Sequence, residues 1–212
     1  PVLKRRRLEV LPFYGVTLND TLIRHHAVGL ELNYFLTEVL SVGVQGIYYL
    51  DSVLDQEFYT RYHFSRVPSL NRYRYTVTGN WSYVPIYGKF TLFNDRIAHY
   101  DLFATAGVGV SGSEIIARDY RYEPFSNPPG LTFPVGLGGR LFVNRFLAVQ
   151  AVFRCYIMLD RFEPAQRGVS DPGRSEVATA KDNTRTDIVN NMIFNIGVSV
   201  FFPTGFRRAT FR

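Results

Sequence analysis

Histidines are the first side chains in this chain to consider for catalysis. His25 and His26 follow Asp20 closely, and a histidine near an acid or a hydroxyl could activate a nucleophile in a lipid-modifying enzyme. The spacing matches no catalytic triad, so polar residues at a membrane interface are the favoured interpretation. His63 and His99 are expected in a loop and a turn. Since the sequence has no HExxH motif, no CxxC motif and no carboxylate–histidine cluster, we expect no catalytic residues, no metal site and no cofactor.

Charged residues of both signs form a second candidate group. Charged side chains are costly to bury unless they are paired, so such a group inside a protein would either neutralise itself or line a polar path. Two roles are therefore open, a salt-bridged plug and the lining of a pore. The choice depends on the elements that hold these residues, which are Glu31, Lys89, Asp101, Arg140 and Arg154.

Alternation of apolar and polar side chains with a period of two predicts β-strands along most of the chain. It is clearest from His26 to Thr37, where the even positions are mostly large and apolar and the odd positions mostly small or polar. In the segment 73–93 the apolar face changes parity near Pro85, which predicts a β-bulge. No segment shows a convincing helical period. The eight expected strands are 8–18, 26–37, 40–50, 73–93, 100–112, 131–143, 147–159 and 188–202.

The two faces of these strands indicate a membrane barrel rather than a soluble sheet. A soluble β-sandwich or lipocalin-like barrel buries its apolar face. Here the polar face carries glycines and charges of both signs, which suit the narrow lumen of an eight-stranded barrel. The other face carries Leu, Val, Phe and Tyr, with aromatic residues near the strand ends, as a lipid-facing wall does. No apolar run is long enough for a transmembrane helix, and the mean hydropathy of −0.05 fits two faces that average out.

Connection lengths predict the orientation, because outer-membrane barrels have short periplasmic turns and longer outer loops. The short turns lie near 37–38, 94–98 and 144–145, and the long loops are 51–72, 113–129 and 160–186. We therefore expect an all-β fold: an eight-stranded antiparallel transmembrane β-barrel in a bacterial outer membrane, with both termini periplasmic. In so narrow a barrel a closed plug is favoured over a pore for the five charges. One domain is expected over 1–212, with the barrel at about 7–203, a basic N-terminal end at 1–6 and a tail at 204–212.

The positive net charge of the chain does not by itself decide which class of partner it binds. A net charge of +6 could suggest nucleic acid, but the basic residues are scattered over loops and one cluster, Lys4–Arg7, and a negatively charged membrane surface fits equally well. We expect no nucleic-acid partner. The cluster could bind peptidoglycan, a periplasmic protein or lipid phosphate, or be a solvated end. Five loop arginines could likewise pair with lipopolysaccharide phosphates or be solvated: Arg61, Arg66, Arg72, Arg118 and Arg121.

The N-terminal sequence and the single cysteine fit an exported protein. The chain opens with Pro1 and has no apolar signal-peptide segment, so we expect a mature form. Cys155 is the only cysteine, so no intramolecular disulfide is expected.

Aromatic residues in two of the long loops form a candidate partner surface. Aromatic residues beside arginine are favoured at protein interfaces. They could also fold onto one another above the barrel, but a partner surface is slightly favoured. The residues are Phe58, Tyr59, Tyr62 and Phe64 in the first loop and Tyr120, Tyr122 and Phe125 in the second.

The final strand resembles a known signal. Asn195, Gly197, Val200 and Phe202 match the pattern of polar, glycine, apolar and aromatic residues that the outer-membrane barrel assembly machinery recognises. Three segments are also similar to a family of OmpA-like eight-stranded "outer membrane beta-barrel domain" proteins, known mainly from myxobacteria and relatives. The segments are KRRRLEVLPFYGVTLND at 4–20, PIYGKF at 85–90 and DLFATAGVG at 101–109. The resemblance covers most of the barrel but not the long loops, and some family members belong to envelope complexes for gliding motility.

These observations lead to one main hypothesis and two alternatives. The main hypothesis is a non-enzymatic barrel that acts as an anchor or subunit of a multiprotein envelope complex, for which the resemblance implies gliding motility. Its expected partners are outer-membrane lipid and lipopolysaccharide, other envelope proteins (barrels, lipoproteins or periplasmic subunits), and the barrel assembly machinery during insertion. The alternatives are a lipid-modifying enzyme with a site at His25 and His26, and a small pore.

Overall fold

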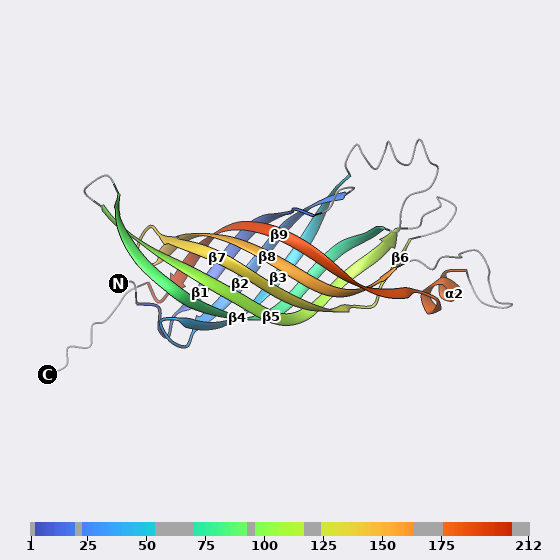
Figure 1. Ribbon diagram of the computed structural model, residues 1–212, viewed down its shortest axis with the longest axis horizontal. Coiled ribbons are helices and arrows are strands. Elements are labelled where there is room, and N and C mark those ends of the chain that lie inside the picture. Colours follow the sequence, from blue (N-terminus) through green and yellow to red (C-terminus); the bar gives the residue numbers. More distant parts are fainter. Residues whose placement is uncertain are drawn as a thin grey trace.

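The chain folds into a barrel of long antiparallel strands, as the alternation predicted (Figure 1). The computed structural model describes residues 3–19, 23–53, 70–92, 96–116, 124–162 and 176–204. The long strands are β1 (Leu8–Thr17), β2 (Ile23–Phe35), β3 (Leu40–Val53), β4 (Leu70–Leu92), β5 (Arg96–Ile116), β7 (Gly130–Phe142), β8 (Leu147–Phe162) and β9 (Arg185–Phe202). The two short elements are β6 (Phe125–Ser126) and α2 (Glu176–Asp182).

The sheet closes because β1 pairs with both β2 and β9. Leu8 lies opposite Tyr34 on one side and Phe202 on the other, and every neighbouring pair of long strands around the ring is antiparallel. Closure satisfies the backbone hydrogen bonds that an open sheet would leave at its edges. The prediction of an all-β, eight-stranded antiparallel barrel is confirmed.

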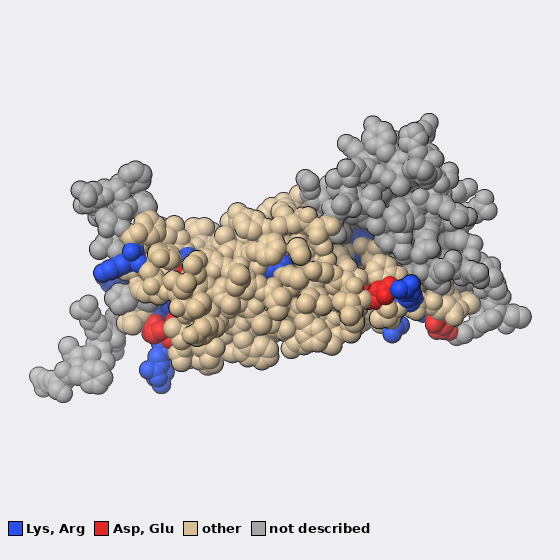
Figure 2. All heavy atoms as spheres, in the orientation of Figure 1, with Lys and Arg blue, Asp and Glu red and all other residues tan. Residues whose placement is uncertain are grey.

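Polar side chains point into this barrel and apolar ones point out. Along β8 buried and exposed positions alternate regularly, with Gln150 and Arg154 inside and Val149 and Phe153 outside. The outward side chains include Leu137, which is 68% exposed. Around the middle of the wall seen in Figure 2 almost no charged side chain reaches the surface. This arrangement is the reverse of a water-soluble barrel, and it matches a wall in contact with hydrocarbon.

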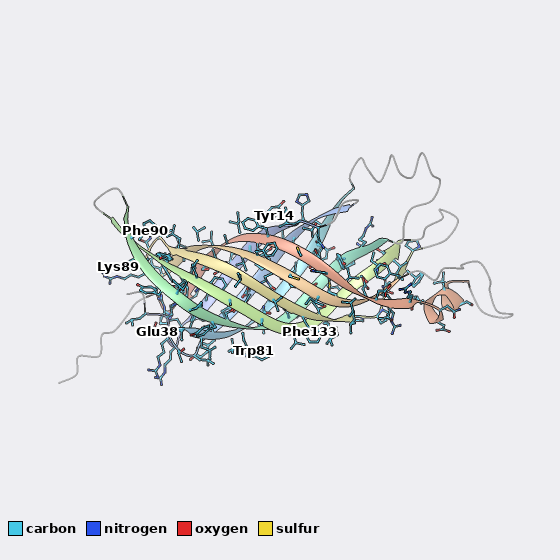
Figure 3. All side chains as sticks on the ribbon, in the orientation of Figure 1. Tyr14, Glu38, Trp81, Lys89, Phe90 and Phe133 are labelled. Atoms are coloured by element: carbon cyan, nitrogen blue, oxygen red, sulfur yellow. The ribbon has the colours of Figure 1, made fainter. Side chains whose placement is uncertain are left out.

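Two irregularities bend β4. The register against β5 shifts between Tyr83 and Ile86, where the change of parity at Pro85 predicted a bulge, and that prediction is confirmed. A second shift, between Tyr73 and Tyr75, was not predicted. Beyond Tyr83 the described pairing of β4 with β3 ends, so the β4–β5 hairpin projects past this end of the barrel, where Figure 3 shows Lys89 and Phe90.

The two ends of the barrel differ. Both termini and the turns at 36–39 and 143–146 lie at one end, which we call the termini end (Figure 1). At the opposite end, the loop end, several strands run on into the predicted long loops, and β4 reaches 23 residues. The short helix α2 lies there too, with Val177 and Ala180 packed on Ile115 and Phe125. Among the described residues no helix is long and apolar enough to span a membrane.

Adjacent glycines on β7 provide a test of the two faces. A Cβ on Gly138 would lie 2.5 Å from Cζ of Phe103 inside the barrel, whereas one on Gly139 would meet nothing closer than 3.5 Å outside. We expect Gly138→Val to destabilise the barrel by about 1–3 kcal/mol through overpacking. Gly139→Val, the matched control, should stay within about 0.5 kcal/mol of the parent. Urea unfolding in detergent micelles measures both, and equal effects would contradict the assignment of faces.

Candidate functional site: the charged lumen

Four of the five predicted lumen charges lie inside the barrel. Glu31, Asp101, Arg140 and Arg154 are each no more than 4% exposed. Lys89 does not join them, because its side chain is exposed on the projecting β4–β5 hairpin. Lys89 lies opposite His99, past the last pairing of β4 with β3, where no opposite wall encloses it. The lumen assignment of Lys89 is therefore corrected.

The first ion pair joins two strands across the middle of the lumen. Arg154 on β8 donates from Nη2 to Oε2 of Glu31 on β2 at 2.8 Å. Gln45 donates to the same carboxylate at 3.3 Å, and the hydroxyl of Tyr156 donates to the Gln45 carbonyl oxygen at 2.8 Å. Because all four side chains are buried, these hydrogen bonds take the place of the water that the two charges lose.

A second cluster surrounds Arg140, nearer the termini end. Its guanidinium lies 2.9 Å from the Glu9 carboxylate and 3.5 Å from that of Asp101. Lys4 Nζ lies 2.6 Å from the same Oδ2 atom of Asp101. Three aromatic rings also face the Arg140 guanidinium, with centroids 5.1–5.5 Å away, and cation–π contacts of this kind stabilise a desolvated cation. The rings belong to Phe35, Phe103 and Phe201.

One asparagine links the two clusters. Asn33 Nδ2 donates to Glu9 at 3.2 Å and to Glu31 at 3.0 Å. The joined network then holds three cations and three carboxylates, so its net charge is zero. Neutrality matters because an excess charge in so dry an interior would be costly. The six ionic members are Lys4, Glu9, Glu31, Asp101, Arg140 and Arg154.

The basic N-terminal cluster is divided between the lumen and the surface. Lys4 and Arg7 are 3% and 2% exposed, whereas Arg5 and Arg6 project outward. Arg7 donates to the backbone carbonyls of Arg145, Phe201 and Pro203, and so closes the mouth at the termini end. Burial lowers the pKa of Lys4, and the hydrogen bond to Asp101 opposes that shift. Two of the four basic residues are therefore structural, which corrects the expectation of a wholly solvated or partner-binding end.

A third polar group closes the loop end, and the sequence did not point to it. Asp160 accepts hydrogen bonds from Ser113 at 2.6 Å, Asn71 at 2.7 Å and Asn127 at 3.2 Å. These residues lie outside the segments in which apolar and polar residues alternate along the sequence. The alternation therefore did not predict that their side chains point inward. Phe125 beside them is 5% exposed and packs on Ile115, so it is a buried residue rather than part of a partner surface.

Little space remains between these groups. A cavity beside Glu31, Arg154 and Asn195 has a volume of about 10 Å³, which is room for about one water molecule. Eight strands enclose an interior just wide enough for side chains, and here large polar side chains fill it. The geometry therefore matches a plug rather than an open channel.

The residues of the candidate assembly signal divide between the two faces of β9. Asn195 and Gly197 face the lumen, Val200 is half-buried, and Phe202 is exposed. A Cβ on Gly197 would lie 2.5 Å from the carbonyl oxygen of Pro12, so β1 requires glycine there. Recognition by the assembly machinery stays a prediction.

The two histidines whose side chains the structure describes, His26 and His99, each pair with a tyrosine and not with an acid or a nucleophile. His26 stacks on Tyr14, and its Nδ1 is hydrogen-bonded to the tyrosine hydroxyl on the outer wall. His99 makes the same kind of pair with Tyr87, at 2.6 Å. Within the described ranges, no group of three or more His, Cys, Asp or Glu could hold a metal ion.

Several candidate residues cannot be placed. His63, Asp20, four of the five loop arginines and the remaining partner-surface aromatics lie outside the described residues, and so does the side chain of His25. These are Arg61, Arg66, Arg118, Arg121, Phe58, Tyr59, Tyr62, Phe64, Tyr120 and Tyr122. The fifth loop arginine, Arg72, lies on β4 and is half-buried.

The pair of Glu31 and Arg154 can be tested by a double-mutant cycle. Arg154→Met leaves a buried carboxylate without its cation and should cost about 3–5 kcal/mol. Glu31→Gln combined with Arg154→Met removes both charges and should cost less than Arg154→Met alone. The free energy of unfolding in urea is the measurement. Additive losses would show that the two side chains do not interact.

The filled lumen also leads us to expect no ion conduction. The purified barrel, inserted into a planar lipid bilayer, should give no steady step currents, because charged side chains and not water occupy its axis. Glu31→Ala combined with Arg154→Ala removes both members of a buried pair and is the matched control that should raise the current. Resolved steps of constant size in the parent protein would contradict a closed plug.

Comparison with known proteins identifies the fold of the chain but assigns it to no family. No protein-family model matches the chain, and no curated protein sequence matches it. Among solved structures, it is similar to the N-terminal β-barrel domain of OprF from Pseudomonas aeruginosa, at 12% identity and a TM-score of 0.54 over 93% of this chain and 98% of that chain. It is also similar to Neisserial surface protein A, at 9% identity and a TM-score of 0.52 over 92% and 95% of the two chains. The chain thus has the fold of the eight-stranded outer-membrane β-barrels.

Proposed function

We propose that the protein is a non-enzymatic outer-membrane β-barrel that acts as an anchor or subunit of a multiprotein envelope complex. The observation that carries the proposal is an apolar wall closed around a filled lumen, whose ion-paired network is neutral. Such a barrel holds a fixed place in a membrane but transports nothing through its axis. Its wall, its loops and its two ends remain for binding.

The wall supports the membrane location. Exposed aromatic side chains accompany the aliphatic ones, among them Tyr14, Trp81 and Phe133 (Figure 3). Tyrosine and tryptophan favour membrane–water interfaces because their rings are apolar and their polar atoms reach water. Short turns face the periplasm in outer-membrane barrels, so the termini end would be periplasmic and the long loops would lie at the cell surface.

The geometry around His26 favours a structural role over an enzymatic one. Its Nδ1 is hydrogen-bonded to the Tyr14 hydroxyl on the outer wall, and Tyr87 and His99 form the same kind of pair on another part of the barrel, the β4–β5 hairpin. A tyrosine–histidine pair that occurs twice on a wall is better explained as an interfacial contact than as a catalytic base.

The nature of the complex is the finer part of the proposal. Segments 4–20, 85–90 and 101–109 resemble the outer-membrane β-barrel domain family, and because some members of that family belong to gliding-motility complexes, such a machine is the candidate. The aromatic residues of loop 51–72 are the proposed partner surface, and lipopolysaccharide phosphates are proposed to pair with the loop arginines. The signal on β9 would deliver the chain to the barrel assembly machinery.

Affinity purification from the native outer membrane tests the proposal. The tagged protein, extracted in mild detergent, should co-purify with envelope proteins at a constant ratio, identified by mass spectrometry. The quadruple variant Phe58→Ser, Tyr59→Ser, Tyr62→Ser and Phe64→Ser should release an outer partner. Aromatic side chains carry much of the binding energy of protein interfaces. The matched control is Gly139→Val on the wall, which leaves these loops intact. Recovery of the barrel alone in every detergent would contradict the complex.

A further inference from the structure

Residues Lys4–Arg7 form a tight turn with two faces. The backbone N–H of Arg7 donates to the carbonyl of Lys4 at 3.1 Å, which closes a four-residue β-turn. The first and fourth side chains enter the lumen and are almost fully buried. The two central ones, Arg5 and Arg6, project from the termini end. The turn thus uses its outer positions as anchors and presents its central positions to the surroundings.

Arg6 occupies a position that normally belongs to glycine or asparagine. Its φ of 61° lies in the left-handed region, which is unfavourable for a side chain with a Cβ. The contact that holds it is specific, since the Arg6 N–H donates to the Phe35 carbonyl at 2.8 Å. Backbone strain at an exposed residue is a reason to look for a function of its side chain.

The exposed arginines at the termini end have no carboxylate partner among the described residues. In the part of the chain that the structure describes, Arg5, Arg6 and Arg145 make no ion pair. The Glu38 carboxylate accepts instead the backbone N–H groups of Lys4, at 2.7 Å, and Arg5, at 3.3 Å. At the loop end, by contrast, two exposed arginines do have carboxylate partners, in the pairs Arg74–Glu114 and Arg185–Asp187, whereas the exposed Arg161 makes no ion pair with the described residues.

These arginines surround one mouth of the barrel. Arg7 donates to the Arg145 carbonyl at 2.8 Å, so the turn at 143–146 adjoins the turn at 4–7. The Arg6 N–H binds the end of β2, next to the turn at 36–39. Basic side chains at this end of the molecule are visible in Figure 2.

Apolar side chains at the same level indicate what lies around the mouth. The turns themselves carry exposed apolar residues, namely Leu36, Val39, Val143 and Phe146. Turns that stood free in water would have no reason to expose four such side chains. At the boundary between acyl chains and headgroups, apolar side chains contact lipid while arginines reach the phosphates. This combination favours a lipid surface over an acidic protein.

We propose that Arg5, Arg6 and Arg145 form a binding site for the phosphates of anionic phospholipids in the leaflet at the termini end. One guanidinium group can donate two parallel hydrogen bonds to the oxygens of a phosphate. The three arginines lie on adjoining turns and make no ion pair with the described residues, so they are available for such contacts. The site rests on the proposed membrane location and orientation. It would fix the depth of the barrel while Lys4 and Arg7 keep the turn in place.

Lipid retention by the full-length protein tests the site. The protein in uncharged detergent is mixed with equal amounts of phosphatidylglycerol and phosphatidylcholine, and native mass spectrometry counts the lipids bound. We expect phosphatidylglycerol to be preferred, and R5Q/R6Q/R145Q to lower its binding about tenfold. R74Q/K181Q/R185Q removes the same charge at the loop end and should retain the binding. Glycerol phosphate in excess should compete weakly, because it lacks the acyl chains.

The variant R6G separates function from fold. Glycine accepts the left-handed backbone, so R6G should unfold at the same temperature as the parent or higher, yet bind less phosphatidylglycerol. Full lipid binding by R6G and by the triple variant would overturn the proposal, as would equal loss in the loop-end control. Loss of a co-purifying acidic protein with lipid binding unchanged would assign the arginines to a protein instead. Fractionation of the parent protein away from the outer membrane would contradict the proposed function, whatever the result in detergent.

Discussion

The interaction on which the structure most depends is the one between Arg140 and its two carboxylates. One guanidinium on β7 reaches Glu9 on β1 and Asp101 on β5, and so joins strands from different parts of the ring across the lumen. A charge at that depth is tolerated only when it is fully paired, so the position of Arg140 also requires the buried Lys4, which balances Asp101. The closure of the mouth at the termini end follows from this requirement.

The narrowness of an eight-stranded barrel explains the remaining composition of its interior. Large side chains fill the lumen, so some inward positions must lack a Cβ, as Gly138 does opposite Phe103 on the neighbouring strand. Amides and hydroxyls occupy the levels between the ion pairs and connect them, Asn33 being the clearest case. The apolar residues that would form a core in a soluble protein lie on the wall instead, and lipid would replace the core as their surroundings.

The strands and their faces were predictable because alternation is a local property of the sequence. So was the bulge at Pro85, since a change of parity is visible within a single strand. The partners of each charge were not predictable, because contacts across a lumen depend on the stagger of eight strands at once. Glu9 was overlooked on a strand with weak alternation, and Lys4 and Arg7 lie outside any strand. Lys89 has the parity of its neighbours but lies beyond the enclosed part of the barrel. The helix α2, with seven residues, is too short to show a helical period.

The filled lumen also bears on the role of the charged residues outside it. The network inside is neutral without Arg5, Arg6 or Arg145, so these three contribute nothing to the balance of the plug. The turn is firmly anchored, because Lys4 is held by the Asp101 carboxylate and Arg7 by the backbone carbonyls of Arg145 and Phe201, which are far away in the sequence. Anchoring of this kind can hold Arg6 in a backbone conformation that a free turn would avoid. The same four-residue turn therefore seals the barrel on one side. On its other side it presents arginines that make no ion pair with the described residues and that an outside anion can pair with.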